Sequence, residues 1–243
     1  MQLRGKRIIV TGAAGGIGSA AVRAFLAEGA DVVPMDQLAG PGGCLALDVA
    51  DRASVDTAFT AAIERLGGLD VLVHAAGVDV LAPAATVTDA IWHANMTVNA
   101  LGTMHTNQRA FPAMRDGGGG AIINLGSDAG LVPTISNGAY AASKAAVHVW
   151  TRAIATEWGP FNVRANAVLP VVETPLSRSH RAAMTPEEGA VYDDGMAKRI
   201  KLGGCMGDPD EDLAPLLVFL ASDGSRFITG QLLAANGGYG MVR

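Results

Sequence analysis

Short apolar runs alternate with longer alanine-rich stretches along this chain, and this alternation restricts the possible fold more than any other feature. Strand-like runs are found at 7–10, 31–36, 44–49, 69–77, 120–127, 162–170 and 231–238. Segments of helical length and composition separate most of them, at 17–29, 51–66, 95–115, 138–158 and 210–222. A repeated order of strand, helix and strand is typical of a parallel sheet covered by helices on both faces, with right-handed crossovers. The sequence therefore predicts a doubly wound α/β fold.

No linker or change of composition divides the chain, so we expect one domain over residues 1–243. Segment 175–209 interrupts the alternation, because it is polar, carries both signs of charge and has no strand pattern. A long excursion of this kind is typical of a functional lid or of a disordered loop. The apolar residues in or beside it that would cover a substrate are Met184, Met196, Met206 and Tyr192. An exposed loop is the alternative to this lid.

Hydrophobic residues make up 49% of the chain and charged residues 17%, which is enough apolar material for a buried core. The formal net charge is -5 with no cluster of lysine or arginine, so we expect neither nucleic acid nor an anionic membrane as a partner. Cys44 and Cys205 are too few for a disulfide framework or a cysteine metal site, which fits a reducing cytoplasm. We also expect no signal peptide and no membrane span, since no apolar run approaches about eighteen residues.

A glycine-rich turn, TGAAGGIGSAA, follows the first predicted strand at residues 11–21. Glycines at a strand-to-helix turn let the backbone approach a pyrophosphate closely, with amide N–H groups directed at it from the helix N-terminus. Gly12, Gly16 and Gly18 are the candidates for this role, and Gly16, Gly18 and Ala21 satisfy the dinucleotide-binding fingerprint. The position directly after a first strand predicts a dinucleotide site of the Rossmann type.

The second predicted strand ends in Asp36, 18 residues after Gly18. A carboxylate at this place accepts hydrogen bonds from the adenosine ribose hydroxyls and repels a 2′-phosphate. The neighbours Ala14 and Gln37 supply no cation that would hold a 2′-phosphate. The cofactor that we predict is therefore NAD rather than NADP.

Three further signals occur in order along the chain: Asn99 in TVNALG, Ser127 in NLGSDAG, and Tyr140 with Lys144 four positions later. Together with the T-G-x-x-x-G-x-G pattern at 11–18, they resemble the classical short-chain dehydrogenase/reductase family, which also has a serine thirteen residues before the tyrosine. The resemblance covers essentially the whole chain. It implies a seven-stranded parallel sheet and a catalytic tetrad of Asn99, Ser127, Tyr140 and Lys144.

The tetrad has a chemical reason, because removing a hydride from a secondary alcohol leaves a carbonyl only if the hydroxyl proton also departs. The resemblance implies that Tyr140 is the general acid/base, while Lys144, together with the positive nicotinamide ring, lowers the pKa of that phenol and also binds the nicotinamide ribose. Ser127 would orient the substrate oxygen and stabilise its developing charge. Asn99 would hold a water that passes protons from Lys144 towards solvent.

The chain departs from the family at two places that meet the cofactor. The usual N-N-A-G after the fourth strand is His74-Ala75-Ala76-Gly77, and the usual P-G-x-V/I-x-T after the sixth is Pro170-Val171-Val172-Glu173-Thr174, which lacks the glycine. We expect cofactor binding to survive the first change, while the second affects how Thr174 meets the nicotinamide. The resulting cofactor-binding set is Gly12, Gly16, Ile17, Gly18, Asp36, Asp48, Val49, Ala75, Ala76, Gly77, Tyr140, Lys144, Pro170, Val172 and Thr174.

The remaining polar residues receive modest roles. Asp128 is expected to cap the turn that follows Ser127, with a substrate contact as the alternative. The histidines, His74, His93, His105, His148 and His180, lack the spacing of a metal site, so we predict no metal and interpret them as packing or surface residues. His93 and His180 are the two that could face a substrate.

These signals predict an NAD-dependent oxidoreductase that interconverts a secondary alcohol and a ketone on a small to medium-sized, fairly apolar molecule. An NADP-dependent 3-oxoacyl-thioester reductase and a non-catalytic NAD-binding regulator are the alternatives. An enoyl reductase would normally have a wider spacing between its tyrosine and lysine. The resemblance also implies a homotetramer, with a dimer as runner-up, formed through the helices at 95–115 and 138–158 and the C-terminal end. Substrate identity, stereochemistry and direction are left open by the sequence.

Overall fold

A computed structural model describes residues 1–37 and 43–240, and its centre is a seven-stranded sheet with the order β3-β2-β1-β4-β5-β6-β7. All neighbouring strands in it are parallel. The strands are β1 (Arg7–Thr11), β2 (Asp31–Asp36), β3 (Leu45–Ala46), β4 (Val71–His74), β5 (Gly120–Leu125), β6 (Val163–Pro170) and β7 (Leu232–Ala235). The predicted doubly wound α/β fold is confirmed. The strands predicted at 44–49, 69–77 and 231–238 are shorter than expected, and the first of them pairs at the sheet edge over two residues only.

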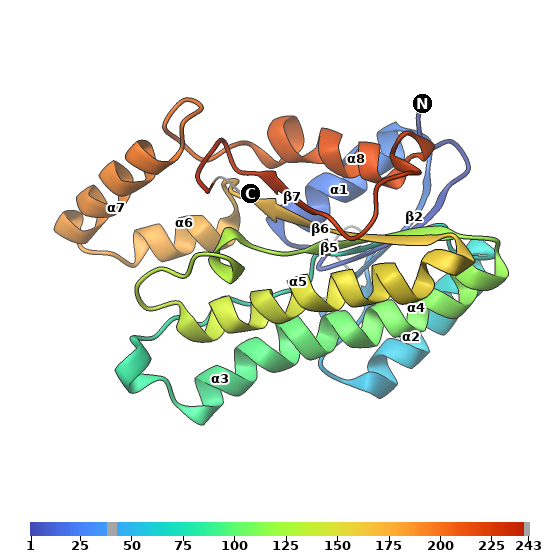
Figure 1. Cartoon of the computed structure of the whole chain (residues 1–243), viewed down its shortest axis with the longest axis horizontal. Coiled ribbons are helices and arrows are strands. Elements are labelled where there is room, and N and C mark those ends of the chain that lie inside the picture. Colours follow the sequence, from blue (N-terminus) through green and yellow to red (C-terminus); the bar gives the residue numbers. More distant parts are fainter. Residues whose placement is uncertain (38–42, 241–243) are drawn as a thin grey trace.

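Helices cover both faces of the sheet (Figure 1). One face carries α1 (Gly16–Ala27) and α8 (Ala214–Ala221), and the other carries α2 (Arg52–Leu66), α4 (Gly102–Asp116) and α5 (Gly138–Trp158). The strands between these layers read as continuous apolar runs because both of their faces are buried; all four residues of β4 are buried. The chain therefore has two hydrophobic cores, one on each side of the sheet.

The segment predicted as one helix at 95–115 is longer and less regular than expected. It consists of α3 (Asp89–Asn95), a π-helical turn η3 (Met96–Leu101) and α4, with Pro112 inside the last. A second π-helical turn, η6 (Pro209–Leu213), precedes α8. The short 3-10 turns are η2 (Ala84–Thr86), η4 (Asp128–Gly130), η5 (Gly159–Phe161) and η7 (Asp223–Ser225). π-helical turns often occur at functional sites, and η3 carries Asn99, one of the candidate catalytic residues.

Most of segment 175–209 folds into two helices, α6 (Pro175–Ala182) and α7 (Pro186–Arg199), which project beyond the end of the sheet (Figure 1). Each helix begins with a proline preceded by a threonine, Thr174 or Thr185, whose side chain closes a capping box. These local signals explain why a polar segment without a strand pattern is helical rather than irregular.

The two helices are joined by side chains at their facing surfaces. Arg181 on α6 donates from Nε and NH2 to the two carboxylate oxygens of Asp193 on α7, at 2.9 and 2.8 Å. Gly189 of α7 lies against the same guanidinium group, where a Cβ would collide with it. The close approach at Gly189 keeps α6 and α7 together as one unit, which we call the α6–α7 pair.

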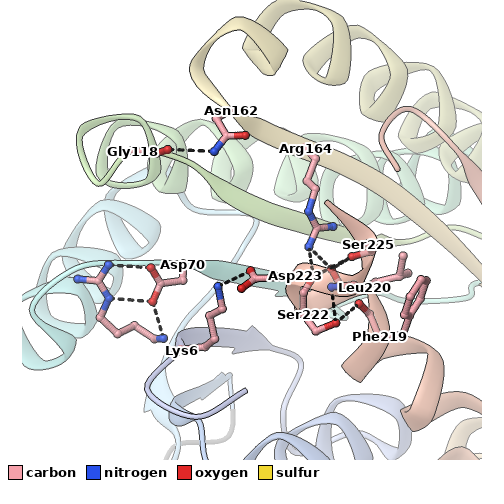
Figure 2. Close-up of polar contacts among 12 residues, drawn as sticks. Lys6, Asp70, Gly118, Asn162, Arg164, Phe219, Leu220, Ser222, Asp223 and Ser225 are labelled. Atoms are coloured by element: carbon pink, nitrogen blue, oxygen red, sulfur yellow. Dashed lines mark hydrogen bonds and ion pairs between the residues drawn. The ribbon is translucent and has the colours of Figure 1, made fainter. Parts of the chain in front are cut away.

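Polar contacts tie together the edge of the sheet at which the strands begin (Figure 2). Lys6 Nζ, just before β1, donates to Asp223 Oδ1 after α8 at 2.8 Å. Arg164 near the start of β6 donates to the backbone oxygen of Ser222 at 3.1 Å. These bonds fix the helices of one face to the strand starts, so this edge is held by structural contacts while the opposite edge carries the cavities described next.

Candidate active site

Two adjoining cavities lie at the edge where the strands end. The strand order reverses direction between β1 and β4, and open α/β sheets bind ligands at the carboxyl ends of the strands beside such a point. The smaller cavity is about 190 Å³ and is lined by Gly12, Asp36, Val49, Ala75, Ala76 and Gly77 of the predicted cofactor set. The larger is about 510 Å³ and is lined by Ile17, Ala75, Gly77, Ser127, Tyr140, Lys144, Pro170, Val172 and Thr174. Because Ala75 and Gly77 line both, the two cavities can hold the two ends of one extended molecule.

The glycines of the turn after β1 have separate structural reasons. Gly12 has a φ of +65°, and a Cβ there would lie 2.6 Å from the backbone nitrogen of Ala76, so the turn can approach the end of β4 only with glycine. A Cβ on Gly18 would collide with the carbonyl of Gly12. The absence of a Cβ at Gly18 therefore lets α1 begin directly above the turn. A Cβ on Gly16 would lie 2.9 Å from Pro175 Cδ. The turn therefore packs closely while the first-turn N–H groups of α1 have no intrahelical partner.

The two acidic residues predicted on the adenosine side, Asp36 and Asp48, differ in their position relative to the cavities. Asp36 ends β2, lines the smaller cavity and accepts a hydrogen bond from the Ala14 backbone N–H at 3.0 Å. Asp48 accepts from the Ala50 backbone N–H at 2.9 Å, which closes a local turn. Val49 next to it lines the smaller cavity. Both carboxylates thus accept a local backbone N–H, and Asp36 also lines the smaller cavity, whereas Asp48 lines neither cavity.

His74 at the end of β4 takes the place of an asparagine in the family pattern and is buried. Its Nδ1 shares hydrogen bonds with Thr11 Oγ1 at 3.1 Å and Thr106 Oγ1 at 3.0 Å. Burial and, to a smaller extent, the charge of Lys144 together lower the pKa of His74 to about 3, so the imidazole is neutral. The histidine packs behind the cavity wall and leaves Ala75 and Gly77 to line it.

The shortened stretch after β6 still reaches the larger cavity. Val171 N–H bonds to the carbonyl of Ala235, and Val172 forms a parallel bridge with Gly207, so the stretch is held from both sides. Thr174 lines the cavity, but its Oγ1 accepts the Ser177 N–H at 3.1 Å as the cap of α6. Its hydroxyl therefore has a structural bond in addition to any role toward a ligand.

The cavity walls fit an elongated dinucleotide, with Asp36 at one end, the N-terminus of α1 in the middle and Lys144 at the other end. A helix N-terminus supplies the partial positive charge and free N–H groups that a pyrophosphate needs. In the ranges 1–37 and 43–240, no group of three or more His, Cys, Asp or Glu side chains could hold a metal ion.

The predicted catalytic side chains converge from three elements. Ser127 follows β5, Tyr140 and Lys144 lie one turn apart on α5, and Asn99 belongs to η3. Lys144 Nζ lies 5.8 Å from the centre of the Tyr140 ring and donates a 2.8 Å hydrogen bond to the carbonyl of Leu125. The spacing of four on a helix thus places the phenol and the ammonium on the same wall of the larger cavity.

The protein alone holds Tyr140 in the protonated form. The pKa of Tyr140 is raised to about 12, because burial raises it more than the hydrogen bond with Ser127 lowers it, and the charge of Asp79 adds to the rise. The pKa of Lys144 is lowered to about 8, because burial lowers it more than the charge of Asp79 raises it. Among the protein's own residues, desolvation of the phenol is therefore the largest influence on the pKa of Tyr140.

Asn99 is buried and is held by the loop that follows β4. Its Oδ1 accepts from the Val78 N–H, and its Nδ2 donates to the Val78 carbonyl and to Ser143 Oγ, each at 2.9 Å. A Cβ on Gly77 would lie 3.1 Å from Asn99 Oδ1 and 3.6 Å from Lys144 Nζ, so both polar groups flank this glycine. The π-helical turn η3 directs Asn99 towards that point.

The prediction for Asp128 is wrong: the cap of the following turn η4 is Ser127, whose Oγ accepts the Ala129 N–H at 3.2 Å. Asp128 is buried and accepts at 2.9 Å from Nδ2 of Asn236, far along the sequence. Asn236 follows β7, so its bond with the Asp128 carboxylate could not be predicted from the residues around the turn. The Asp128 side chain makes this long-range bond instead of capping η4. The bond links the segment after β5 to the segment after β7.

The α6–α7 pair supplies part of the larger cavity's wall through Tyr192 and Met196 on α7 and Met184 in the connection between the helices. Met206, which follows the pair, lines the same cavity. His180 also lines the cavity, whereas His93 is exposed on α3. His105 and His148 are buried, as expected of packing residues. The lining also includes Asp79 and Tyr239, for which the sequence analysis gave no role. Asp79 lies in a loop after a strand and belongs to no sequence motif, so its position in the cavity could not be predicted from the residues around it.

Comparison with known proteins shows likeness over nearly the whole chain. A family model described as Enoyl-(Acyl carrier protein) reductase matches residues 12–240. D-threitol dehydrogenase of Mycolicibacterium smegmatis is 38% identical over 253 residues, which cover 98% of this chain and 94% of that protein. The 3-oxoacyl-acyl-carrier-protein reductase FabG of Thermotoga maritima is 34% identical over 253 residues, covering 98% and 99%. A solved short-chain type dehydrogenase/reductase from Mycobacterium ulcerans has a TM-score of 0.87 and 26% identity, covering 98% of this chain and 91% of that one.

A doubly wound sheet with cavities at its switch point, in a chain whose relatives are dehydrogenases and reductases, defines an oxidoreductase that works with a nicotinamide cofactor. The match of one family model to nearly all of the sequence makes the assignment more specific. The chain belongs to the classical short-chain dehydrogenase/reductase family, which confirms the resemblance seen in its motifs.

Proposed function

We propose that this protein is an NAD-dependent oxidoreductase that interconverts a secondary alcohol and a ketone on a small to medium-sized substrate. The observation that carries the proposal is the wall of the larger cavity, where Ser127, Tyr140 and Lys144 lie together next to the dinucleotide crevice. A phenol and a hydroxyl on one wall can hold a single substrate oxygen between them, as proton transfer to or from an alcohol requires.

In this proposal Tyr140 takes the hydroxyl proton during oxidation and returns it during reduction. Ser127, which shares a hydrogen bond with Tyr140, holds the same oxygen and stabilises its partial charge. Lys144 places its positive charge near the phenol. Asn99, which flanks Gly77 together with Lys144, binds the water through which protons pass from Lys144 to solvent. When bound, the nicotinamide accepts or supplies the hydride, and in its oxidised form its positive ring favours the phenolate of Tyr140.

The residues that would hold the cofactor are the set predicted from the sequence: Gly12, Gly16, Ile17, Gly18, Asp36, Asp48, Val49, Ala75, Ala76, Gly77, Tyr140, Lys144, Pro170, Val172 and Thr174. NAD is the proposed form, because the carboxylate of Asp36 lines the adenosine end and would repel a 2′-phosphate. The D-threitol dehydrogenase relative supports oxidation of an alcohol as the reaction.

A fairly apolar carbon skeleton is the proposed fit to the part of the cavity formed by Met184, Met196 and Met206. Methionine side chains adapt to irregular apolar shapes, which suits a lid over a substrate. We therefore propose that the α6–α7 pair is that lid, within a single domain of residues 1–243.

One alternative has specific support: an NADP-dependent 3-oxoacyl-thioester reductase, to which the FabG relative points. Asp36 argues against it. A non-catalytic NAD-binding regulator is a further alternative, and the proximity of Ser127, Tyr140 and Lys144 argues against that one, since a regulator needs no proton-transferring phenol.

The experiment that tests the proposal compares NAD and NADP binding by calorimetry and then follows absorbance of the reduced cofactor with a panel of secondary alcohols. We expect tighter binding of NAD and its reduction by some of the alcohols. Tighter binding of NADP together with 3-oxoacyl-thioester reduction would support the reductase alternative. NAD binding without turnover of any alcohol or ketone would support the regulator.

We also propose a cytoplasmic homotetramer, with a dimer as runner-up. Val149 on α5 is 66% exposed and Phe161 beside its end is 47% exposed, which leaves apolar surface on the helices that would meet a second copy. Light scattering of the purified protein measures the number of chains. Within the described ranges, no helix is both long enough and apolar enough to cross a bilayer.

A further inference from the structure

Asp79 is a carboxylate in the larger cavity that has no role in the proposed proton transfer. It lies in the loop after β4 and lines the same cavity as Tyr140 and Lys144. Its Oδ1 is buried and has no hydrogen-bond partner in the part of the chain that the structure describes. A buried carboxylate oxygen without a donor is costly, because it has lost its hydration without replacement.

Asp128, a buried carboxylate that lines the same cavity, shows the contrast. Asp128 is satisfied by Nδ2 of Asn236 at 2.9 Å and serves to join two segments. Asp79 makes no such bond through Oδ1, and rotation about its Cβ–Cγ bond is soft, so either oxygen can turn to a donor that enters the cavity. A donor carried by the substrate would satisfy it.

The charges around Asp79 indicate which donor this is. Burial raises the pKa of Asp79, while the nearby His180 and Lys144 lower it. With two basic side chains already close by, a substrate ammonium would be repelled by the same groups that stabilise the carboxylate. A hydroxyl group donates a hydrogen bond without adding positive charge.

The position of Asp79 relative to the reacting oxygen indicates which substrate carbon carries that hydroxyl. Asp79 lines the same cavity as Ser127 and Tyr140, so a hydroxyl on Asp79 belongs to a carbon near the one that is oxidised. The charge of Asp79 also acts on the pKa of the phenol. We propose that Asp79 binds a second hydroxyl of the substrate, beside the one held by Ser127 and Tyr140, and that the enzyme prefers vicinal diols over simple secondary alcohols. The inference rests on the proposed function and refines its substrate to an otherwise apolar molecule that carries an adjacent hydroxyl.

The test compares 2,3-butanediol with 2-butanol, which differ by the second hydroxyl, using each stereoisomer and NAD with the wild-type protein and Asp79→Ala. We expect a higher kcat/KM for one diol isomer than for 2-butanol. In Asp79→Ala the ratio of the two kcat/KM values should fall about 10-fold to 100-fold, because a charge-assisted hydrogen bond is lost. Asp79→Asn keeps the size of the side chain and should lower the ratio less, since its carboxamide oxygen still accepts.

The matched control is Asp194→Asn, which removes an exposed carboxylate of α7 that pairs with Lys198 at 2.6 Å. It should leave the ratio unchanged. A ratio near one in the wild type, or one that Asp79→Ala does not alter while both alcohols are oxidised, would overturn the inference and leave the proposed function standing. Preference for 3-amino-2-butanol over the diol would also overturn it, in favour of a cationic substrate. Absence of turnover with every alcohol would refute the proposed function and this inference with it.

Discussion

At the scale of single residues, the phenol of Tyr140 is governed by burial rather than by the lysine one turn away. Lys144 lies 5.8 Å from the ring centre, and desolvation still raises the phenol's pKa to about 12. The protein alone therefore stores the proton on Tyr140, which suits the acid needed for ketone reduction. Oxidation requires a further positive charge near the phenol, and in the proposed function the oxidised cofactor brings it.

Tyr140→Phe is expected to lower kcat about 100-fold to 10,000-fold in both directions, because no other group on that wall carries a proton in the right place. The affinity for NADH should stay within about threefold of wild type, since the ring remains. Steady-state kinetics and calorimetric titration measure the two quantities. Retained turnover in the variant would show that Tyr140 is not the acid/base.

The pH dependence of alcohol oxidation follows from the same pKa. The reactive form is the phenolate, whose fraction rises about tenfold per pH unit below the pKa, so kcat/KM for oxidation should rise from about pH 6 upwards and then level off. The pH at which kcat/KM reaches half of its plateau value gives the pKa of Tyr140 with the cofactor bound, which should be below the value of about 12 in the protein alone. A profile of kcat/KM between about pH 6 and about pH 10 checks this. A flat profile would assign the proton to another group.

At the scale of elements, the helical stretch α3-η3-α4 uses a repeated clamp. Asn95 bonds through its side chain to the backbone of Val80, with Nδ2 donating at 2.9 Å and Oδ1 accepting at 3.3 Å. Asn99 makes the same pair of bonds with Val78. Only Asn99 could be assigned from the sequence, because Asn95 belongs to no motif and its partner lies on a separate loop.

The clamp provides a matched pair of variants. Asn99→Ala and Asn95→Ala should each lower the free energy of unfolding by about 2 kcal/mol, since each leaves the backbone of a loop valine without partners. Only Asn99→Ala should also lower kcat, about tenfold or more, because Asn99 adjoins Gly77 and Lys144. Urea unfolding and kinetics separate the effects. Equal losses of kcat would reduce Asn99 to a structural residue.

At the scale of the whole molecule, two neutral histidines are buried in the interior near the ends of β4 and β5. Burial, with a smaller effect of nearby cations, lowers the pKa of His74 to about 3 and that of His148 to about 4. Between the ordinary value of 6.5 and these values, the unfolded chain binds a proton that the folded chain does not. Lowering the pH through this window therefore favours unfolding.

Each of the two histidines should cost the folded state about 1.4 kcal/mol per pH unit below the ordinary histidine pKa. Asn fits the hydroxyl environment of His74, so His74→Asn should reduce the slope of unfolding free energy against pH by about that amount between about pH 4.5 and about pH 6. Chemical denaturation at several pH values gives the slope, and the exposed His93→Asn is the control. An unaltered slope in His74→Asn would mean that this imidazole is protonated in the folded protein.

The sequence by itself determined the features that depend on local spacing. Alternating strands and helices predicted the sheet, the glycines after β1 predicted the turn above which α1 begins, and the spacing of four predicted that Tyr140 and Lys144 share one wall. The capping threonines before α6 and α7 are local signals too, but the sequence analysis did not use them and expected a lid or a disordered loop in that segment. Such features can be predicted because helices and strands have fixed periods, so residues close in sequence have known relative positions in space.

Only the tertiary structure decided the features that depend on burial and on partners from distant segments. The pKa of Tyr140, the bond between Asp128 and Asn236, and the unsatisfied oxygen of Asp79 all result from packing of separate strands and loops around one cavity. Desolvation and hydrogen-bond partners are set by which atoms surround a group in space, and no period along the chain encodes those neighbours.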